Sequence, residues 1–489
     1  MWIEEEIQKD ATEIQHSIYE LARDYNAQSI RSVRSRITEK KESTTEFFKN
    51  MYETLRKAEY DIYRQFATIE SPSSDTSTSK YLTHEFTEIK NSANDLPHPR
   101  ILSELQRDYD RLRGQTGHNT DSENNRYIPY KVYSYIREKS EYCIRFKAHI
   151  NGRAVSLYFI TFPESHISIC SKTTPSSYLC AGEIAMYQVY AYKVFIWLSI
   201  ISRLANKECS EKLDVYFYMT PFKKERPDHG GGNLSAMHVN TGLTRNCETH
   251  GEIIVYRTEE WFKVFIHESM HNFNMDFIEM ELHEANERLR QAFCIPHDDV
   301  LLFESYTEAW ARIITIMIDT YFNKDASSTA NIADTRVRFI RTVREKLANN
   351  ALFHVYQAVK VLDIMNLKYS EITVLTTENM EVCRKRYKED TNVYAYYILG
   401  GILSAYALPF VCWCCDNNKG HGRDRGIQAI RFSCSSNNLS RFVDFICRAS
   451  RDPVLLNMIS FIESSSSSSS SSNTKQGAIL KKTMRMTPD

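Results

Sequence analysis

The sequence predicts an α+β fold that is predominantly helical and contains a small mixed sheet. Apolar residues recur at spacings of three and four from Ile3 to Ile69, which is typical of amphipathic helices. Residues 142–162 instead alternate apolar and polar side chains around Asn151-Gly152, a pattern that predicts a β-hairpin with a type I′ turn. Beyond residue 324 the spacing is again helical, as far as about residue 463.

Composition indicates a globular chain with balanced charge. Its 489 residues are 42% hydrophobic, enough for a large core, and the length suggests two to three domains. The 61 basic and 62 acidic residues leave a net charge of −1, so we expect neither a nucleic acid nor a membrane partner. Residues 1–6 lack a secretory signal and the twelve cysteines are scattered, which predicts an intracellular, cytoplasmic protein with mostly reduced thiols.

Shifts in composition predict six segments along the chain. Dense charges of both signs in the first segment favour a solvated helical surface that can bind a helical partner. Nine consecutive serines near the other end cannot bury enough surface to order that segment. The predicted segments are a helical hairpin or coiled region at 1–70, a polar linker at 71–79, a helical and loop connector at 80–126, a core at 127–323, a helical subdomain at 324–463 and a disordered serine-rich tail at 464–489.

The predicted core orders its elements around one helix at residues 259–277. Thr258 supplies a possible N-cap for that helix, and two acidic residues follow in its first turn. Apolar runs with β-branched and aromatic residues predict strands, and longer runs at helical spacing predict helices. The expected elements are a helix at 181–205, strands at 212–219 and 252–256, and helices at 281–293 and 300–322.

The helix at 259–277 carries the pattern His267-Glu268-x-x-His271. Two histidines four residues apart lie on one face of a helix, so both imidazoles can reach one metal ion. Zinc accepts imidazole nitrogen in tetrahedral sites and, in catalytic sites, keeps one position for water. Glu268 would then lie beside that water and take its proton as general base. The alternative is a pair of structural histidines with Glu268 in solvent.

This motif and the residues that follow it resemble the gluzincin branch of the zinc metallopeptidases. The run at 304–308, Glu-Ser-Tyr-Thr-Glu, is similar to the Glu-Gly-x-Ala-Glu run of its aminopeptidase-like members, with Ser and Thr replacing Gly and Ala. The resemblance implies that Glu304 is the third zinc ligand and that Glu308 orients a ligand histidine. A second register, with Glu308 as the ligand, stays open. Phe277 stands where metzincins carry a third histidine.

The resemblance extends over residues 237–312 and implies a zincin-like catalytic domain with a helical C-terminal subdomain. Residues 237–244 resemble the edge strand on which an extended peptide substrate binds. In the helical subdomain, Tyr396 and Tyr397, with Tyr394 beside them, are candidates to stabilise the oxyanion, and core packing is the alternative. Residues 259–268 also resemble uncharacterised proteins of large double-stranded DNA viruses, a likeness that implies no function.

Other patterns carry weaker signals. Val393–Cys415 contains 23 residues without a charge, long enough to cross a bilayer, but its Gly-Gly and Pro favour a buried helix or two helices broken near Pro409. A lone Cys-x-x-Cys pair near His421 gives slight support to a second metal site. Three histidines in predicted loops are expected to be polar surface rather than ligands: His229, His238 and His250.

We therefore expect a zinc-dependent metallopeptidase that cleaves a protein or peptide substrate. In this interpretation His267, His271 and Glu304 bind the metal, and Glu268 is the general base. One alternative is an inactive zincin scaffold with a structural role, associated with a virus particle. The other is a zinc hydrolase that acts on a non-peptide amide.

Overall fold

The computed structural model describes eleven stretches of the chain, and the connecting residues are left out of the account below. The described residues are 2–29, 41–67, 82–90, 95–104, 127–163, 181–227, 233–295, 299–323, 332–418, 426–467 and 475–488. The predicted linker at 71–79, His229 and His421 lie outside them. Within the predicted connector at 80–126, residues 100–104 are helical.

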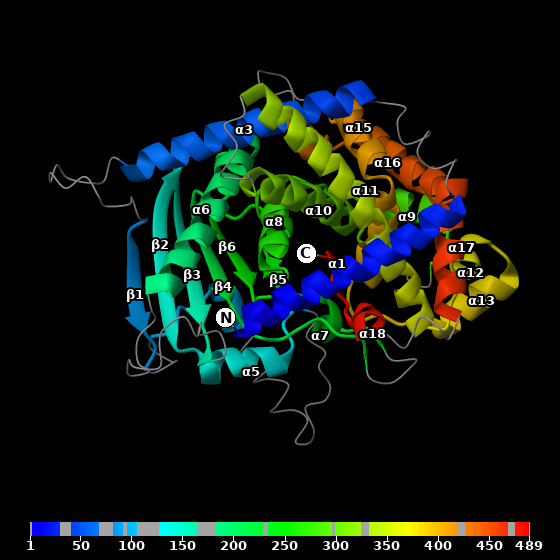
Figure 1. Cartoon of the computed structure of the whole chain (residues 1–489), viewed down its shortest axis with the longest axis horizontal. Coiled ribbons are helices and arrows are strands. Elements are labelled where there is room, and N and C mark those ends of the chain that lie inside the picture. The colour runs from blue at the N-terminus through cyan, green and yellow to red at the C-terminus, as the bar shows by residue number, and fades with distance from the viewer. Residues whose placement is uncertain are drawn as a thin grey trace, which may run out of the picture. The chain divides into compact units, whose positions relative to one another are not determined.

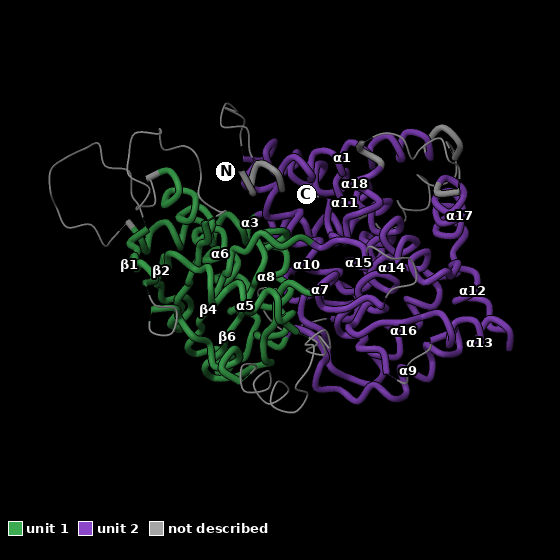
Figure 2. Tube along the Cα trace, turned by 90° about the horizontal axis from the view of Figure 1, so that it is seen from below, with its two compact units in different colours: residues 1–7, 53–223, 240–274 green, residues 8–52, 224–239, 275–489 purple. Residues whose placement is uncertain are grey.

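Two compact units make up the chain, and each is built from three separated segments (Figure 2). Unit 1 contains Met1–Ile7, Glu53–Lys223 and Asn240–Asn274, and unit 2 contains Gln8–Tyr52, Lys224–Val239 and Met275–Asp489. The contiguous boundaries predicted from composition differ from this division, because residues 275–323 of the predicted core belong to unit 2.

A six-stranded mixed sheet dominates unit 1 and confirms the predicted α+β class (Figure 1). The strand order is β1-β2-β3-β4-β6-β5; β3–β4 and β4–β6 pair in parallel and the other neighbours antiparallel. The strands are β1 His84–Glu88, β2 Tyr142–Ile150, β3 Arg153–Thr161, β4 Lys212–Tyr218, β5 Gly242–Thr244 and β6 His250–Val255.

The predicted hairpin is confirmed as β2 and β3. Asn151 and Gly152 form its turn with φ of 50° and 83°, the left-handed pair that a type I′ turn requires. Strand β1 was not predicted, because all five of its residues are exposed and give no alternating apolar signal. Its main chain pairs with β2, and its Phe86 ring stacks on Tyr142 at 5.2 Å.

Helices α6 and α8 cover one face of this sheet. α6 (Ala181–Leu204) is the crossover between the parallel strands β3 and β4, and it packs against β2 and α8. α8 (Trp261–Asn272) packs against β5 and β6 and is buried from Phe262 to Asn272. The predicted Thr258 cap is wrong, because the N-cap is Glu260, with a left-handed φ of 58°.

Unit 2 is mostly helical, as the spacing of apolar residues predicts. Its core combines helices from both ends of the chain: Phe47 of α3 packs on Trp310 of α10, with ring centroids 5.5 Å apart. The N-terminal helices are α1 (Trp2–Ser29) and α3 (Lys41–Ala67), and each contributes residues to both units. The helices wholly in unit 2 are α7 Ala236–Val239, α9 His283–Arg290, α10 Leu302–Phe322, α11 Ile332–Ile364, α12 Tyr369–Thr373, α13 Thr377–Arg386, η2 Tyr394–Leu399, α14 Gly400–Ala405, α15 Ala407–Asn417, η3 Ile427–Ile430, α16 Ser436–Ala449, α17 Pro453–Ser467 and α18 Lys475–Lys482.

The uncharged run Val393–Cys415 is broken rather than continuous. η2 and α14 end at Ala405, and α15 leaves at 90° after Tyr406. The break precedes Pro409, since proline is tolerated in the first turn of α15. Within the described residues, α6 from Gly182 is long and apolar enough to span a membrane, and the bent pair passes the same test if counted as one span.

The predicted disordered tail differs from the structure. Ser464–Ser467 belong to α17, residues 475–482 form α18, and residues 483–488 are buried. The composition of this segment does not predict its order. The segment is held by side chains elsewhere in unit 2 that bind its main chain, and its own side-chain pattern carries no signal of that.

Candidate metal centre

Helix α8 presents both histidines of the motif on one face. The Nε2 atoms of His267 and His271 lie 3.2 Å apart, and the rings are nearly perpendicular at 76°. Two nitrogens bound to one zinc ion at 2.0–2.1 Å in tetrahedral geometry are separated by roughly 3.3 Å. The two imidazoles, each about 95% buried, are therefore spaced as a shared zinc ion requires.

Glu304, the predicted third ligand, lies on α10 in unit 2, and its place beside the two histidines stays a prediction. Two imidazole nitrogens and one carboxylate oxygen form a donor set that zinc accepts. The residues present thus fit the ion that the sequence predicts.

Asn392 holds the Glu304 carboxylate. Its Nδ2 atom donates a hydrogen bond of 3.3 Å to Glu304 Oε1. Asn392 lies two residues before η2, a π-helical turn, and such turns are frequent at functional sites. Sequence reasoning missed Asn392 because no pattern links it to a glutamate 88 residues away.

Glu268, which lies between the two histidines in the sequence, is buried and packs against strand β5. A Cβ atom added to Gly242 would lie 2.9 Å from both Cγ and Oε1 of Glu268 and 2.7 Å from Cγ1 of Val264. Only glycine allows the β5 main chain to approach this carboxylate so closely. Gly242 was not singled out from the sequence, because its requirement is a tertiary contact.

Polar side chains fix α8 against the sheet. Trp197 Nε1 donates to the Ser269 hydroxyl at 2.8 Å, and both residues are fully buried. Asn272, the residue after the second histidine, accepts a 2.6 Å hydrogen bond from the Ser210 hydroxyl and donates to Thr244 at 3.1 Å. These bonds restrict the rotation and sliding of the helix that carries the histidines.

A disulfide lies beside the same end of α8. Cys209 and Cys247 are bonded, and the Cys247 main-chain N–H donates to the Asn272 carbonyl at 3.1 Å. The expectation of mostly reduced thiols holds for the other eight described cysteines but not for this pair. Their spacing of 38 residues gave no signal.

Glu308 is almost fully buried, one turn after Glu304. Its Oε1 accepts a 2.9 Å hydrogen bond from Arg312 Nε, and Arg312 also donates to the Gly400 and Tyr396 carbonyls and to the Ser404 hydroxyl. This network ties α10 to η2 and α14. The predicted role of Glu308 beside a ligand histidine stays a prediction.

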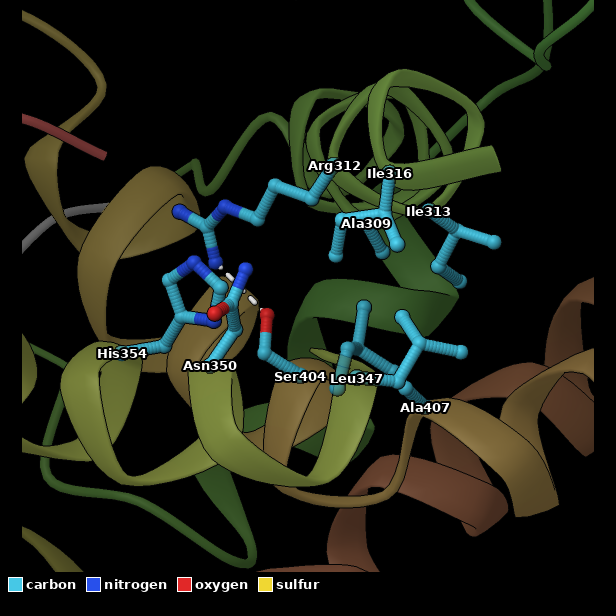
Figure 3. A pocket seen from close by; sticks show the side chains of 10 residues that line it. Ala309, Arg312, Ile313, Ile316, Leu347, Asn350, His354, Ser404 and Ala407 are labelled. Atoms are coloured by element: carbon cyan, nitrogen blue, oxygen red, sulfur yellow. Dashed lines mark hydrogen bonds between the residues drawn. The ribbon is translucent and has the colours of Figure 1, made fainter. Parts of the chain in front are cut away.

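A small cavity adjoins that network, with room for about one water molecule. Figure 3 shows Arg312, Asn350, His354 and Ser404 gathered on one side of it and the apolar side chains, such as Ile313, on the other. Its lining comes from α10, α11, α14 and α15 and excludes the metal-binding group.

The tyrosines predicted to stabilise the oxyanion lie in η2. Tyr397 is buried and its hydroxyl donates to the Met484 carbonyl at 2.5 Å, while Tyr396 is partly exposed. Burial raises the pKa of the Tyr394 phenol well above its ordinary value. Their role in stabilising charge stays a prediction.

The other candidate residues have structural contacts. His238 Nδ1 accepts from the Ser235 main chain at 3.1 Å, and His250 Nε2 lies 2.7 Å from Asp214 Oδ2. Cys412 lies 3.1 Å from the Ser43 hydroxyl, and burial raises the pKa of Cys415 to about 12, which disfavours a metal-binding thiolate.

No family model, curated protein or solved structure matches the chain.

Proposed function

We propose that the chain is a zinc-dependent metallopeptidase of the gluzincin type. One observation carries the proposal: the Nε2 atoms of His267 and His271 are 3.2 Å apart on α8, with Glu268 between them in the motif. That separation matches two ligands of one tetrahedral zinc ion, and it brings two basic nitrogens together in a buried place. In this proposal His267, His271 and Glu304 hold the ion, a donor set that zinc accepts.

A zinc ion held there would supply Lewis-acid activation of a water molecule and of the attacked carbonyl. Glu268 takes the proton of that water as the oxygen attacks the carbonyl carbon, and then passes it to the departing amine. The burial of Glu268, only 8% exposed, excludes bulk solvent from this transfer. Asn392 keeps the Glu304 carboxylate oriented through its hydrogen bond.

The sheet edge supports a peptide as substrate. β5 is the last strand of the sheet, and edge strands offer main-chain groups to an extended peptide. The β5 main chain at Gly242 lies against the Glu268 carboxylate. A peptide that pairs with this edge would pass close to the general base.

Glu268→Gln tests this proposal most simply. The amide keeps the size of the side chain but cannot accept the proton, so we expect one zinc ion per chain and a loss of cleavage of about a thousandfold or more. Zinc is measured by elemental analysis, and cleavage by mass spectrometry of a peptide library. His267→Ala is the matched variant that should lose the zinc as well.

Each outcome separates the proposal from its alternatives. Cleavage that survives in Glu268→Gln would rule out the assigned base. An inactive scaffold would bind zinc and cleave nothing in either form, and a hydrolase of non-peptide amides would leave the peptide library intact but cleave small acylated amines in a Glu268-dependent manner.

A further inference from the structure

Residues 483–488 run through unit 2 as a buried segment after α18. Leu480 of α18 packs with Ile14, Ile18 and Phe353, which anchors the start of the segment. The side chains that follow are almost completely enclosed, with Met484 0% and Met486 3% exposed. A segment with this polar, serine-rich lead would not be expected to enter a core by its own composition.

Side chains of α11 and η2 bind the carbonyl groups of this segment one after another. Four successive carbonyls accept four hydrogen bonds: Thr483 from Lys360 Nζ, Met484 from the Tyr397 hydroxyl, Arg485 from Gln357 Nε2 and Met486 from His354 Nε2. All four donor side chains are at least 95% buried.

The spacing of the donors matches an extended peptide. His354, Gln357 and Lys360 are three residues apart, so they form one stripe along α11. Six residues of helix span about 9 Å, and the three steps from Thr483 to Met486 span about 10 Å in an extended chain. The stripe and the segment therefore stay in register, in opposite directions.

A short ladder completes the binding of the main chain. The Met484 N–H donates to the Lys224 carbonyl at 2.9 Å, the Arg226 N–H donates to the Lys482 carbonyl at 2.7 Å, and Glu225 and Thr483 form an antiparallel bridge. The main chain of the segment is thus hydrogen-bonded both by side chains of α11 and η2 and by the main chain of residues 224–226. Main-chain recognition of this kind accepts any extended peptide whose side chains fit.

We propose that α11, η2 and residues 224–226 form a peptide-binding groove, and that the 479–488 segment is its exchangeable intramolecular ligand. The groove takes an extended peptide with apolar side chains at the positions of Met484 and Met486, both of which are buried. This inference does not depend on the metal centre. Its ligand is a peptide, bound and not cleaved.

Cutting the folded full chain tests the proposal. A recognition sequence for a specific protease replaces part of the serine run at 464–472, the chain is folded and cut, and a fluorescent peptide of residues 475–489 is added. In the uncut chain the tethered segment competes at a roughly millimolar effective concentration. We expect the cut protein to bind the peptide at least about tenfold more tightly than the uncut protein, by fluorescence anisotropy.

Matched variants identify the groove as the binding site. In the cut protein, Gln357→Ala should lower the affinity for the peptide about tenfold. Asn349→Ala, which removes an exposed amide on the same helix, should leave that affinity unchanged. In the peptide, Met484→Asp should abolish binding and Ala478→Asp, at an exposed position, should leave it unchanged. The proposal is overturned if the cut protein retains its own segment against excess peptide, if it unfolds on cutting, or if both protein variants bind alike.

Discussion

At the scale of single residues, the site depends on side chains whose positions are set by neighbours rather than by the motif. The spacing of His267 and His271 follows from one helical turn, which the sequence contains. The approach of Glu268 to β5 depends on the missing side chain of Gly242, and the orientation of Glu304 on Asn392. In the proposed mechanism, Gly242 and Asn392 position Glu268 and Glu304 without taking part in the reaction.

Gly242→Ala should disable the base but not the metal ligands. The added methyl group would lie 2.9 Å from Glu268 Oε1, so the carboxylate must move. We expect kcat/KM for peptide cleavage to fall at least about tenfold, with the zinc content unchanged. Thr244→Ser, a small change on the same strand, should keep activity, and equal activity of the two variants would refute the assigned contact.

Asn392→Ala should weaken zinc binding. Without the hydrogen bond of 3.3 Å, the Glu304 carboxylate loses one contact that orients it, and the loss of such outer contacts costs about 10- to 100-fold in metal affinity. Competition with a fluorescent zinc indicator measures the Kd. Asn437→Ala, an exposed amide on α16, is the control, and an unchanged Kd in Asn392→Ala would show that the contact is irrelevant.

At the scale of secondary structure, the sequence predicted the elements whose signal is local. The hairpin, α6, β4, α8 and α10 follow from periodicity and turn residues, and the twelve residues of α8 contain the whole His-Glu-x-x-His pattern. The elements it missed depend on partners elsewhere: β1 is exposed and held by main-chain pairing, and the 483–488 segment is held by donors on α11.

Lys360 on α11 should give folding a distinct pH dependence. Burial, and secondarily the charge of Arg226, hold the pKa of the Lys360 ammonium well below its usual 10.5. Between the lowered pKa and 10.5 the unfolded chain binds the extra proton, so this group makes the folded state more stable as pH rises, by at most about 1.4 kcal/mol per pH unit.

Lys360→Met isolates that contribution, because the other titrating groups are common to both proteins. Urea unfolding at pH 7, 8 and 9 should show the wild type gaining stability relative to the variant as pH increases. A difference between the two proteins that stays constant across this range would mean that the ammonium is not desolvated in the folded state.

At the scale of the whole molecule, the chain enters each unit three times. The changes of unit after Val239 and Asn274 occur within stretches that contain no polar linker, and the polar stretch that follows Lys223 in the sequence was not predicted as a boundary. Asn274 adopts a left-handed φ of 53° just after α8, a conformation that asparagine tolerates and that ends helices. Composition therefore cannot locate these boundaries, because they are set by long-range packing.

The central claim is that one zinc ion is bound by two imidazoles of α8 and one carboxylate of α10. X-ray absorption at the zinc edge of the zinc-loaded protein tests it most directly. We expect nitrogen and oxygen neighbours at about 2.0–2.1 Å, with the scattering of two imidazole rings, and the loss of one ring in His271→Ala. A sulfur shell at about 2.3 Å that persists in His271→Ala would instead place the zinc on cysteines and contradict the claim.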